Sequence, residues 1–89
     1  MTLLSYLNGI DPNPFQNQTT IAYTVPSTGP VRLVIYDVLG REVAVLADGV
    51  QAPGRHLVQF EATTIPSGVY FSRLEAGRYV ETRLMAVIK

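Results

Sequence analysis

The sequence contains no cysteine and no tryptophan, and His56 is its single histidine. Without cysteine the chain can form neither a disulfide framework nor a thiolate metal site, and thiol catalysis is excluded. One histidine without cysteine is also too few for a zinc site. The missing cysteines leave the cellular compartment undecided, because a disulfide-free domain can persist in any compartment.

Charge is scarce as well. Charged residues make up 16% of the chain, against about 25% in an average soluble domain. Seven basic and seven acidic residues cancel, so nothing favours phosphate binding and no nucleic acid is expected as a partner. The uncharged run 1–10 lacks a basic flank and is interrupted by polar residues and glycine, so we predict neither a signal peptide nor a transmembrane segment there.

The pattern that is present is that of short β-strands. A length of 89 residues fits one domain, no long helical stripe occurs, and turn signals recur about every 8–12 residues, which favours an antiparallel sandwich or barrel. In the segment 21–25, Ile21, Tyr23 and Val25 share one face. We predict strands near Leu3–Leu7, Gln18–Val25, Val31–Asp37, Glu42–Ala47, His56–Glu61, Val69–Glu75 and Tyr79–Ile88.

Glycine-containing turns separate these strands. Asp37 is expected to accept backbone N–H bonds in a type I turn, and Gly40 to supply the positive φ that returns the chain to the sheet. Leu74–Arg78 is expected to repeat this plan, and Pro53-Gly54 suits a type II turn. We interpret Gly40, Gly49 and Gly54 as hairpin glycines. The last strand is apolar on both faces at residues 85–88, which predicts a central strand or one with a covered outer face.

No constellation for catalysis is evident. His56 falls in phase with Val58 and Phe60, so we interpret it as a hydrogen-bonded histidine at a strand end. The acidic residues lie mostly at turns or on polar strand faces, so no catalytic residue and no cofactor is assigned and the chain is not expected to be an enzyme. Asp11, Asn13 and Asn17 could offer oxygen atoms to calcium, but turn hydrogen bonding is the preferred interpretation, and no metal site is assigned.

Six sequence blocks, read together, resemble one family over residues 11–89. They are Pro12–Phe15, Thr19–Pro26, Val31–Val43, Gly54–Phe60, Ser67–Leu74 and Arg83–Met85. The order of these blocks is similar to that of the type A C-terminal sorting domain of the type IX secretion system (the Por secretion system C-terminal domain family). One departure is Leu84, which stands where the family commonly has lysine.

The resemblance implies an immunoglobulin-like antiparallel β-sandwich of about seven strands. It implies a non-catalytic module at the end of a larger secreted protein, often a modular hydrolase, in a Gram-negative bacterium. Its partners would be a covalently linked N-terminal cargo domain, a protein of the outer-membrane secretion machinery and, further, a cell-surface glycan. The product would be secreted or held at the cell surface in association with the outer membrane. Residues 1–10 are then expected to be a linker remnant or first edge strand, and residues 11–89 the sorting and attachment domain.

The final hairpin is the expected recognition element. Segment 73–89 is mildly basic and apolar, so it could pair with a receptor by strand addition, its cations setting the register. The candidate recognition residues are Gly68, Val69, Tyr70, Arg78, Arg83, Met85 and Lys89. If Phe71 is in the core, Tyr70 is expected to face outward or to cap the sheet edge. A packed Tyr70 ring whose hydroxyl reaches water is the preferred interpretation.

Two alternative functions stay open. A sandwich with five tyrosines also suits a carbohydrate-binding module of a modular glycoside hydrolase, in which exposed aromatic rings stack on sugars. The low charge suits a structural spacer that packs against the catalytic domain of its parent.

Overall fold

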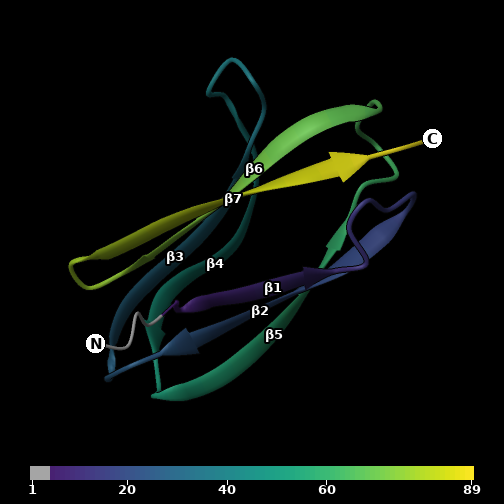
Figure 1. Cartoon of the computed structure of the whole chain (residues 1–89). Helices are drawn as coiled ribbons and strands as arrows, with labels where there is room; N and C mark the ends of the chain where they lie inside the picture. The colour runs from purple at the N-terminus through teal and green to yellow at the C-terminus, as the bar shows by residue number, and fades with distance from the viewer. Residues whose placement is uncertain (1–4) are drawn as a thin grey trace.

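Residues 5–89, which the computed structural model describes, fold into seven strands that form two sheets (Figure 1). The strands are β1 (Leu7–Asp11), β2 (Gln18–Val25), β3 (Gly29–Tyr36), β4 (Glu42–Gln51), β5 (Gly54–Glu61), β6 (Gly68–Ala76) and β7 (Tyr79–Val87). The smaller sheet has the order β1-β2-β5, and the larger has the order β4-β3-β6-β7. All neighbouring strands within the sheets are antiparallel. The described part of the chain contains no helix, so the all-β prediction is confirmed.

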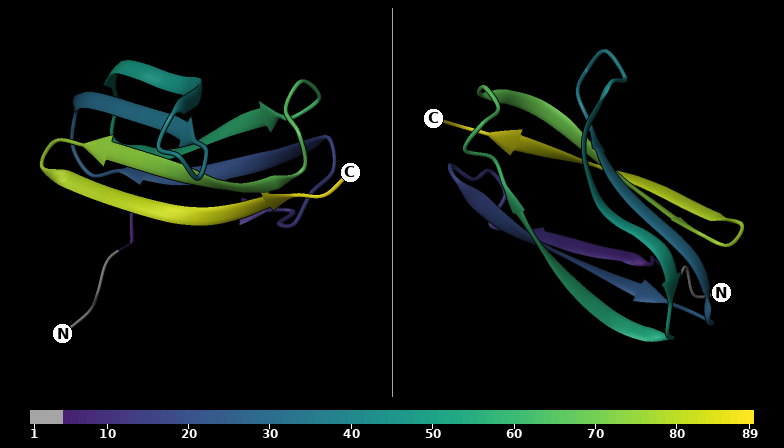
Figure 2. Two further views of the ribbon diagram at one scale, coloured as in Figure 1. Left: turned by 90° about the horizontal axis from the view of Figure 1, so that it is seen from above. Right: turned by 180° about the vertical axis from the view of Figure 1, so that it is seen from behind.

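The two sheets lie face to face, as the views in Figure 2 show. The connections β2–β3, β4–β5 and β5–β6 pass from one sheet to the other, whereas β3–β4 and β6–β7 are hairpins within the larger sheet. Two packed antiparallel sheets with such crossing connections form an immunoglobulin-like sandwich. The fold implied by the resemblance is therefore confirmed.

The core lies between the sheets and follows the predicted alternation. Ile21, Tyr23 and Val25 of β2 are at most 2% exposed, and the same holds for Leu33 and Ile35 of β3. Burial of one large aliphatic side chain contributes roughly 1.5–3 kcal/mol relative to exposure. Alternate residues of the paired strands therefore supply the main stabilisation of this small domain.

The first strand lies farther along the chain than predicted. Residues 3 and 4 of the expected strand Leu3–Leu7 lie outside the described residues, and β1 begins only at Leu7. An irregularity between Leu7 and Gly9 lets both Leu7 and Ile10 pack toward the core, so the side chains do not follow a two-residue alternation. β1 spans both sides of the expected boundary between residues 10 and 11, and that division stays a prediction.

The hairpin between β3 and β4 has the predicted chemistry. One carboxylate oxygen of Asp37 accepts the backbone N–H groups of Leu39 (2.9 Å) and Arg41 (3.0 Å). Gly40 has a φ of 80°, which a residue with a side chain adopts only with strain. The hydrogen bond from the Arg41 N–H is the main cause of a lowered pKa at Asp37. The Arg41 guanidinium and the Leu39 N–H lower this pKa further, whereas burial opposes them in part.

The other turns differ from their predictions. The β6–β7 turn has only two residues, Gly77 and Arg78, because Ala76 pairs directly with Tyr79. Glycine at the first turn position with a φ of 61° suits a tight primed turn, so this hairpin does not repeat the Asp37 plan. Gly49 lies inside β4, and Gly54 begins β5 after a connection between the two sheets. These two glycines are therefore not hairpin glycines.

β7 is an edge strand, so the prediction of a central strand is wrong. Its core face carries Met85 and Val87, which are 1% and 2% exposed, whereas Leu84 and Ile88 are 57% and 55% exposed. What is covered is the hydrogen-bonding edge of β7 near its end, which contacts the segment before β2. A strand that is apolar on both faces can thus lie at a sheet edge when another segment covers that edge.

Ser72 in β6 carries a buried hydroxyl without a hydrogen-bond partner. Its side chain is 0% exposed and lies on the core side of the larger sheet. Because an unpaired buried hydroxyl is unfavourable by about 1–3 kcal/mol in proteins, Ser72→Ala is expected to raise the free energy of unfolding by about 1 kcal/mol. Urea denaturation of the two proteins measures this change, and a loss of stability in the variant would show that the hydroxyl has a partner.

Candidate recognition surface

The last residue is anchored to the loop between β5 and β6. The backbone N–H of Lys89 donates to Ser67 Oγ at 3.0 Å. Its side-chain Nζ donates to the carbonyl oxygens of Thr63 (3.3 Å) and Ile65 (2.5 Å). The chain end and the start of β6 therefore form one continuous surface, with Lys89 itself exposed.

Five of the seven predicted recognition residues come together at this end of the larger sheet. Gly68 pairs with Val87 and Val69 with Ala86, while Tyr70 pairs with Met85. The group formed by Gly68, Val69 and Lys89, called here the C-terminal patch, is exposed. Tyr70 and Met85 lie beneath it, facing the core.

The condition for an outward Tyr70 is not met, because Tyr70 and not Phe71 belongs to the core. Tyr70 is 5% exposed and belongs to the core, whereas Val69 is 40% exposed and Phe71 is half-buried on the opposite face. The Tyr70 hydroxyl donates to the Pro66 carbonyl oxygen at 2.7 Å, which satisfies its polar atom inside the fold. Met85 is 1% exposed. A partner reaches neither side chain in the native fold.

The two arginines of the candidate set lie apart from the C-terminal patch. Arg78 is exposed in the β6–β7 turn, at the opposite end of the sheet. Arg83 lies midway along β7, where its Nε is 3.7 Å from a carboxylate oxygen of Glu81. The structure therefore does not gather the expected cations into one site.

The outer face of the larger sheet carries an apolar strip beside the patch. We define this strip by two cross-strand pairs, Val69 with Ala86 and Phe71 with Leu84. Leu84 is 57% exposed, so it adds apolar surface to this face. Leu84 was not among the predicted recognition residues, although its phase opposite Met85 could have indicated its exposure.

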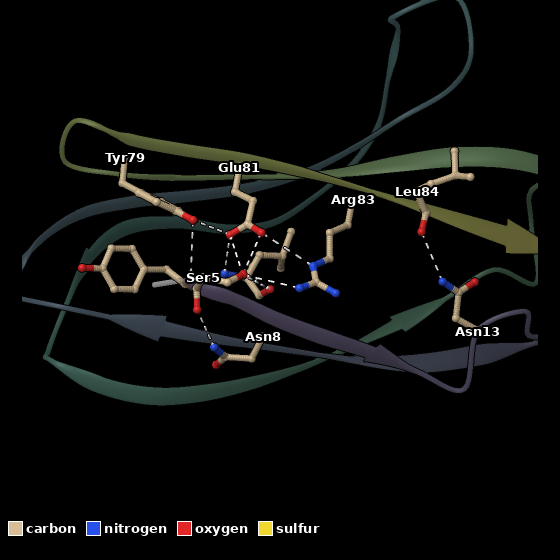
Figure 3. Close-up of polar contacts among 9 residues, drawn as sticks. Ser5, Asn8, Asn13, Tyr79, Glu81, Arg83 and Leu84 are labelled. Atoms are coloured by element: carbon tan, nitrogen blue, oxygen red, sulfur yellow. Dashed lines mark hydrogen bonds and ion pairs between the residues drawn. The ribbon is translucent and has the colours of Figure 1, made fainter. Parts of the chain in front are cut away.

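The edge of β7 near the C-terminus is covered by the segment between β1 and β2 (Figure 3). Asn13 Nδ2 donates to the Leu84 carbonyl oxygen at 3.2 Å, and the Ala86 N–H donates to Asn13 Oδ1 at 3.1 Å. The Phe15 N–H donates to the Ala86 carbonyl at 3.0 Å, and the Ile88 N–H donates to the Phe15 carbonyl at 2.9 Å. Asn13 thus bonds to β7 and does not cap its own turn, which differs from the preferred interpretation of this loop.

Glu81 fastens the start of β1 to the other end of β7 (Figure 3). Its carboxylate accepts hydrogen bonds from the Ser5 hydroxyl (2.7 and 3.0 Å), the Leu7 N–H (3.0 Å) and the Tyr79 hydroxyl. The rings of Tyr6 and Tyr79 meet edge to face with centroids 4.4 Å apart. Burial opposes ionisation of Glu81, but the hydrogen bonds and Arg83 outweigh it and lower the pKa of this carboxyl group.

A lowered pKa at Glu81 predicts acid sensitivity. Its ionised form stabilises the fold fully above the ordinary glutamate pKa of about 4.3, and this contribution is lost as the pH falls through the lowered folded-state pKa. We expect Glu81→Gln to be less stable than the wild type at pH 7, with the difference shrinking near pH 3. Urea denaturation at both pH values measures this, with Glu61→Gln, at an exposed glutamate of β5, as the control. A constant difference at both pH values would contradict the prediction.

His56 has a structural role in the described part of the chain. A ring nitrogen of His56 lies 2.9 Å from the Ala52 carbonyl oxygen, and the ring stacks on Tyr23 at 5.3 Å, as expected for a structural histidine near a strand end. Within residues 5–89, no group of three His, Cys, Asp or Glu side chains could hold a metal ion. The same residues include no helix of the length and hydropathy needed to span a membrane.

The tyrosines form no exposed stacking platform. Tyr23 and Tyr70 are buried, and Tyr6, Tyr36 and Tyr79 are half-buried. The Tyr23 hydroxyl donates to Gln51 Oε1 at 2.8 Å, and the Tyr79 hydroxyl donates to Glu81. Packing and internal hydrogen bonds therefore account for these rings better than sugar stacking does.

Comparison with known proteins gives one family. The profile of the secretion system C-terminal sorting domain matches residues 10–89. No curated protein and no solved structure matches the chain. Since the matched region covers nearly the whole chain, the protein belongs to the family of secretion system C-terminal sorting domains, which are non-catalytic modules that address secreted or cell-surface proteins to the type IX secretion machinery.

Proposed function

We propose that this domain directs a covalently linked N-terminal cargo through the type IX secretion system to the cell surface of a Gram-negative bacterium. The proposal includes a hydrolase as parent protein and association with the outer membrane after export. Residues 1–10 would act as a linker remnant or first edge strand, and residues 11–89 as the sorting domain. The match to the sorting-domain family over residues 10–89 is the observation that carries the proposal.

The recognition surface that we propose is the C-terminal patch together with the neighbouring apolar strip and Arg83. Val69 is 40% exposed and Leu84 57% exposed, so both can contact a receptor without unfolding. Tyr70 and Met85 would act indirectly, by supporting the strands that carry the patch. Arg78 lies at the other end of the sheet, on the side where the cargo would be attached, and is therefore left out of the proposed surface.

The position of the cargo junction supports this choice. Ser5 and Leu7 bond to Glu81 near the β6–β7 turn, whereas Lys89 lies at the opposite end of β7 (Figure 1). The longest dimension of the domain is 37 Å. A cargo attached before Ser5 would therefore leave the C-terminal patch open to a receptor.

The test is an export assay with two matched double variants. The chain is fused behind a periplasmic reporter in a host with this secretion system. Val69→Ser with Lys89→Glu changes the patch, while Leu57→Ser with Arg55→Glu makes the same chemical changes on β5 of the smaller sheet. Leu57 is 64% exposed, so the control substitutions also avoid the core. We expect surface delivery to fall at least tenfold for the first pair only.

Circular dichroism melts establish that both variants are folded. Equal delivery by the two folded variants would contradict the proposed surface. Full delivery of a reporter that lacks the whole domain would contradict the sorting function itself. Deleting β7 is a poorer test, because Met85 and Val87 belong to the core and their loss would unfold the domain.

A further inference from the structure

We infer that the outer edge of β7 is a docking edge for an extended strand of the secretion machinery, and that Asn13–Phe15 is a cover that this strand must replace. The inference rests on the proposed function and adds to it the secondary structure of the partner and the segment that controls access. In the isolated domain the cover therefore occupies this outer edge of β7 near the C-terminus.

The cover reproduces the hydrogen bonds of an added strand. In an antiparallel ladder, alternate residues direct both backbone groups to the same side. Residues 84, 86 and 88 of the β7 segment point outward, and four of their groups are bonded by the cover: the Leu84 carbonyl, the Ala86 N–H and carbonyl, and the Ile88 N–H. The Asn13 side-chain amide takes the place of a peptide group, supplying one donor and one acceptor.

The cover also indicates the chemistry of the strand that would replace it. Phe15 forms a bridge with Val87 in the parallel sense. Its ring is 4% exposed and meets Phe60 edge to face with centroids 6.1 Å apart. A replacing strand would run parallel to β7 and place a large apolar side chain where Phe15 now lies. Backbone pairing of this kind gives affinity, and the side-chain pocket gives specificity.

The cover is held by its four hydrogen bonds to β7 and by the buried Phe15 ring, and the carbonyl oxygen of the adjoining Pro12 accepts a hydrogen bond from Thr19 Oγ1 at 2.6 Å. Pro12, Asn13 and Pro14 are exposed, and the two prolines have no N–H to donate. Between the contacts of Asn13 and those of Glu81 lies Thr82, which is exposed on the outermost strand of its sheet. An approaching strand can therefore make its first contact at Thr82 and then displace the cover toward the C-terminus.

The first experiment measures opening of the cover by amide hydrogen exchange. Asn13→Ala removes both side-chain bonds to β7, whereas the matched control Asn17→Ala removes an exposed amide in the same loop. We expect the Ala86 and Ile88 amides to exchange at least tenfold faster in Asn13→Ala than in Asn17→Ala, with the amides that pair β7 to β6 unchanged. Equal exchange in the two variants would overturn the role of Asn13–Phe15 as a cover.

The second experiment tests what docks. A photoreactive benzoylphenylalanine at Thr82 is introduced into the exported fusion protein, and its adducts are mapped by mass spectrometry. We expect an adduct with an extended segment of an outer-membrane secretion protein, and a several-fold higher yield in Asn13→Ala than in Asn17→Ala. Asn13→Asp, which keeps the acceptor for Ala86 but loses the donor to Leu84, should give an intermediate yield and tests the inference if the alanine variant does not fold.

The outcomes separate the inference from the proposed function. Export that depends on the domain, combined with an adduct yield that is the same in folded Asn13 and Asn17 variants, overturns the inference alone. An adduct only with a second copy of this chain, or no adduct, also overturns it. Export that continues without the domain removes the proposed function instead.

Discussion

Met85→Ala is expected to abolish surface delivery by unfolding the domain, although Met85 contacts no receptor in the native fold. The side chain is 1% exposed between the sheets. Truncating a buried methionine to alanine costs about 2–5 kcal/mol, a large part of the roughly 5–15 kcal/mol that stabilises a typical domain. Urea denaturation of the isolated chain and the export assay of the fusion measure the two effects.

Met85→Leu separates structure from recognition at the same position. Leucine nearly conserves the volume, so we expect a loss below about 1.5 kcal/mol and normal delivery. If Met85→Leu is as stable as the wild type but is not delivered, the machinery reads the methionine itself, and the native core position of Met85 is then not the conformation that the receptor binds. If Met85→Ala is delivered normally, delivery does not depend on the buried position of Met85 in the core.

Phe15→Ala is expected to be the most destabilising change outside the strands. Phe15 is 4% exposed and packs against Phe60 at the end of the sandwich. Replacing a buried phenylalanine by alanine costs about 3–5 kcal/mol. Urea denaturation measures the loss, with Gln16→Ala as the control because the side chain of Gln16 is exposed in the same loop.

Phe15→Leu separates apolar volume from the aromatic contact at this position. Both variants keep the backbone N–H and carbonyl that bond to β7, but leucine restores much of the buried apolar volume, so Phe15→Leu should recover more than half of the stability lost in Phe15→Ala. Equal losses in the two variants would mean that the aromatic contact with Phe60, and not apolar volume, holds this end of the sandwich. A loss below about 1 kcal/mol in Phe15→Ala would contradict the assigned burial, since core substitutions of this size rarely cost so little.

Most of the fold was predictable from the sequence because strand alternation and turn chemistry are local. Ile21, Tyr23 and Val25 had to share a face once the segment was a strand, and Asp37 with Gly40 define their turn by short-range hydrogen bonds and backbone freedom. β1 was misplaced because its side chains follow an irregular spacing from Leu7 to Ile10, which no two-residue pattern reveals.

The site was less predictable because its contacts join distant parts of the chain. Asn13 contacts β7 across 71 residues and Glu81 contacts Ser5 across 76, so no local pattern marks either side chain. One signal was available for Asn13: it stands between two prolines, where the backbone lacks donors and a side chain must supply them. The face of Tyr70 could be given only conditionally, because the apolar residues on both sides of β6 gave two possible phases.

The placement of the two chain ends has a mechanical consequence. Ser5 and Leu7 lie beside Glu81 at one end of β7, and Lys89 lies beside Ser67 at the other. If the domain carries an N-terminal cargo as proposed, a pull between that cargo and a partner held at Lys89 would act lengthwise along the strands. Under such tension β1 would slide along β2 and β7 along β6, so many hydrogen bonds of each ladder would have to break together and not one after another. The proposed attachment points would therefore load the domain in the direction in which its ladders resist force most.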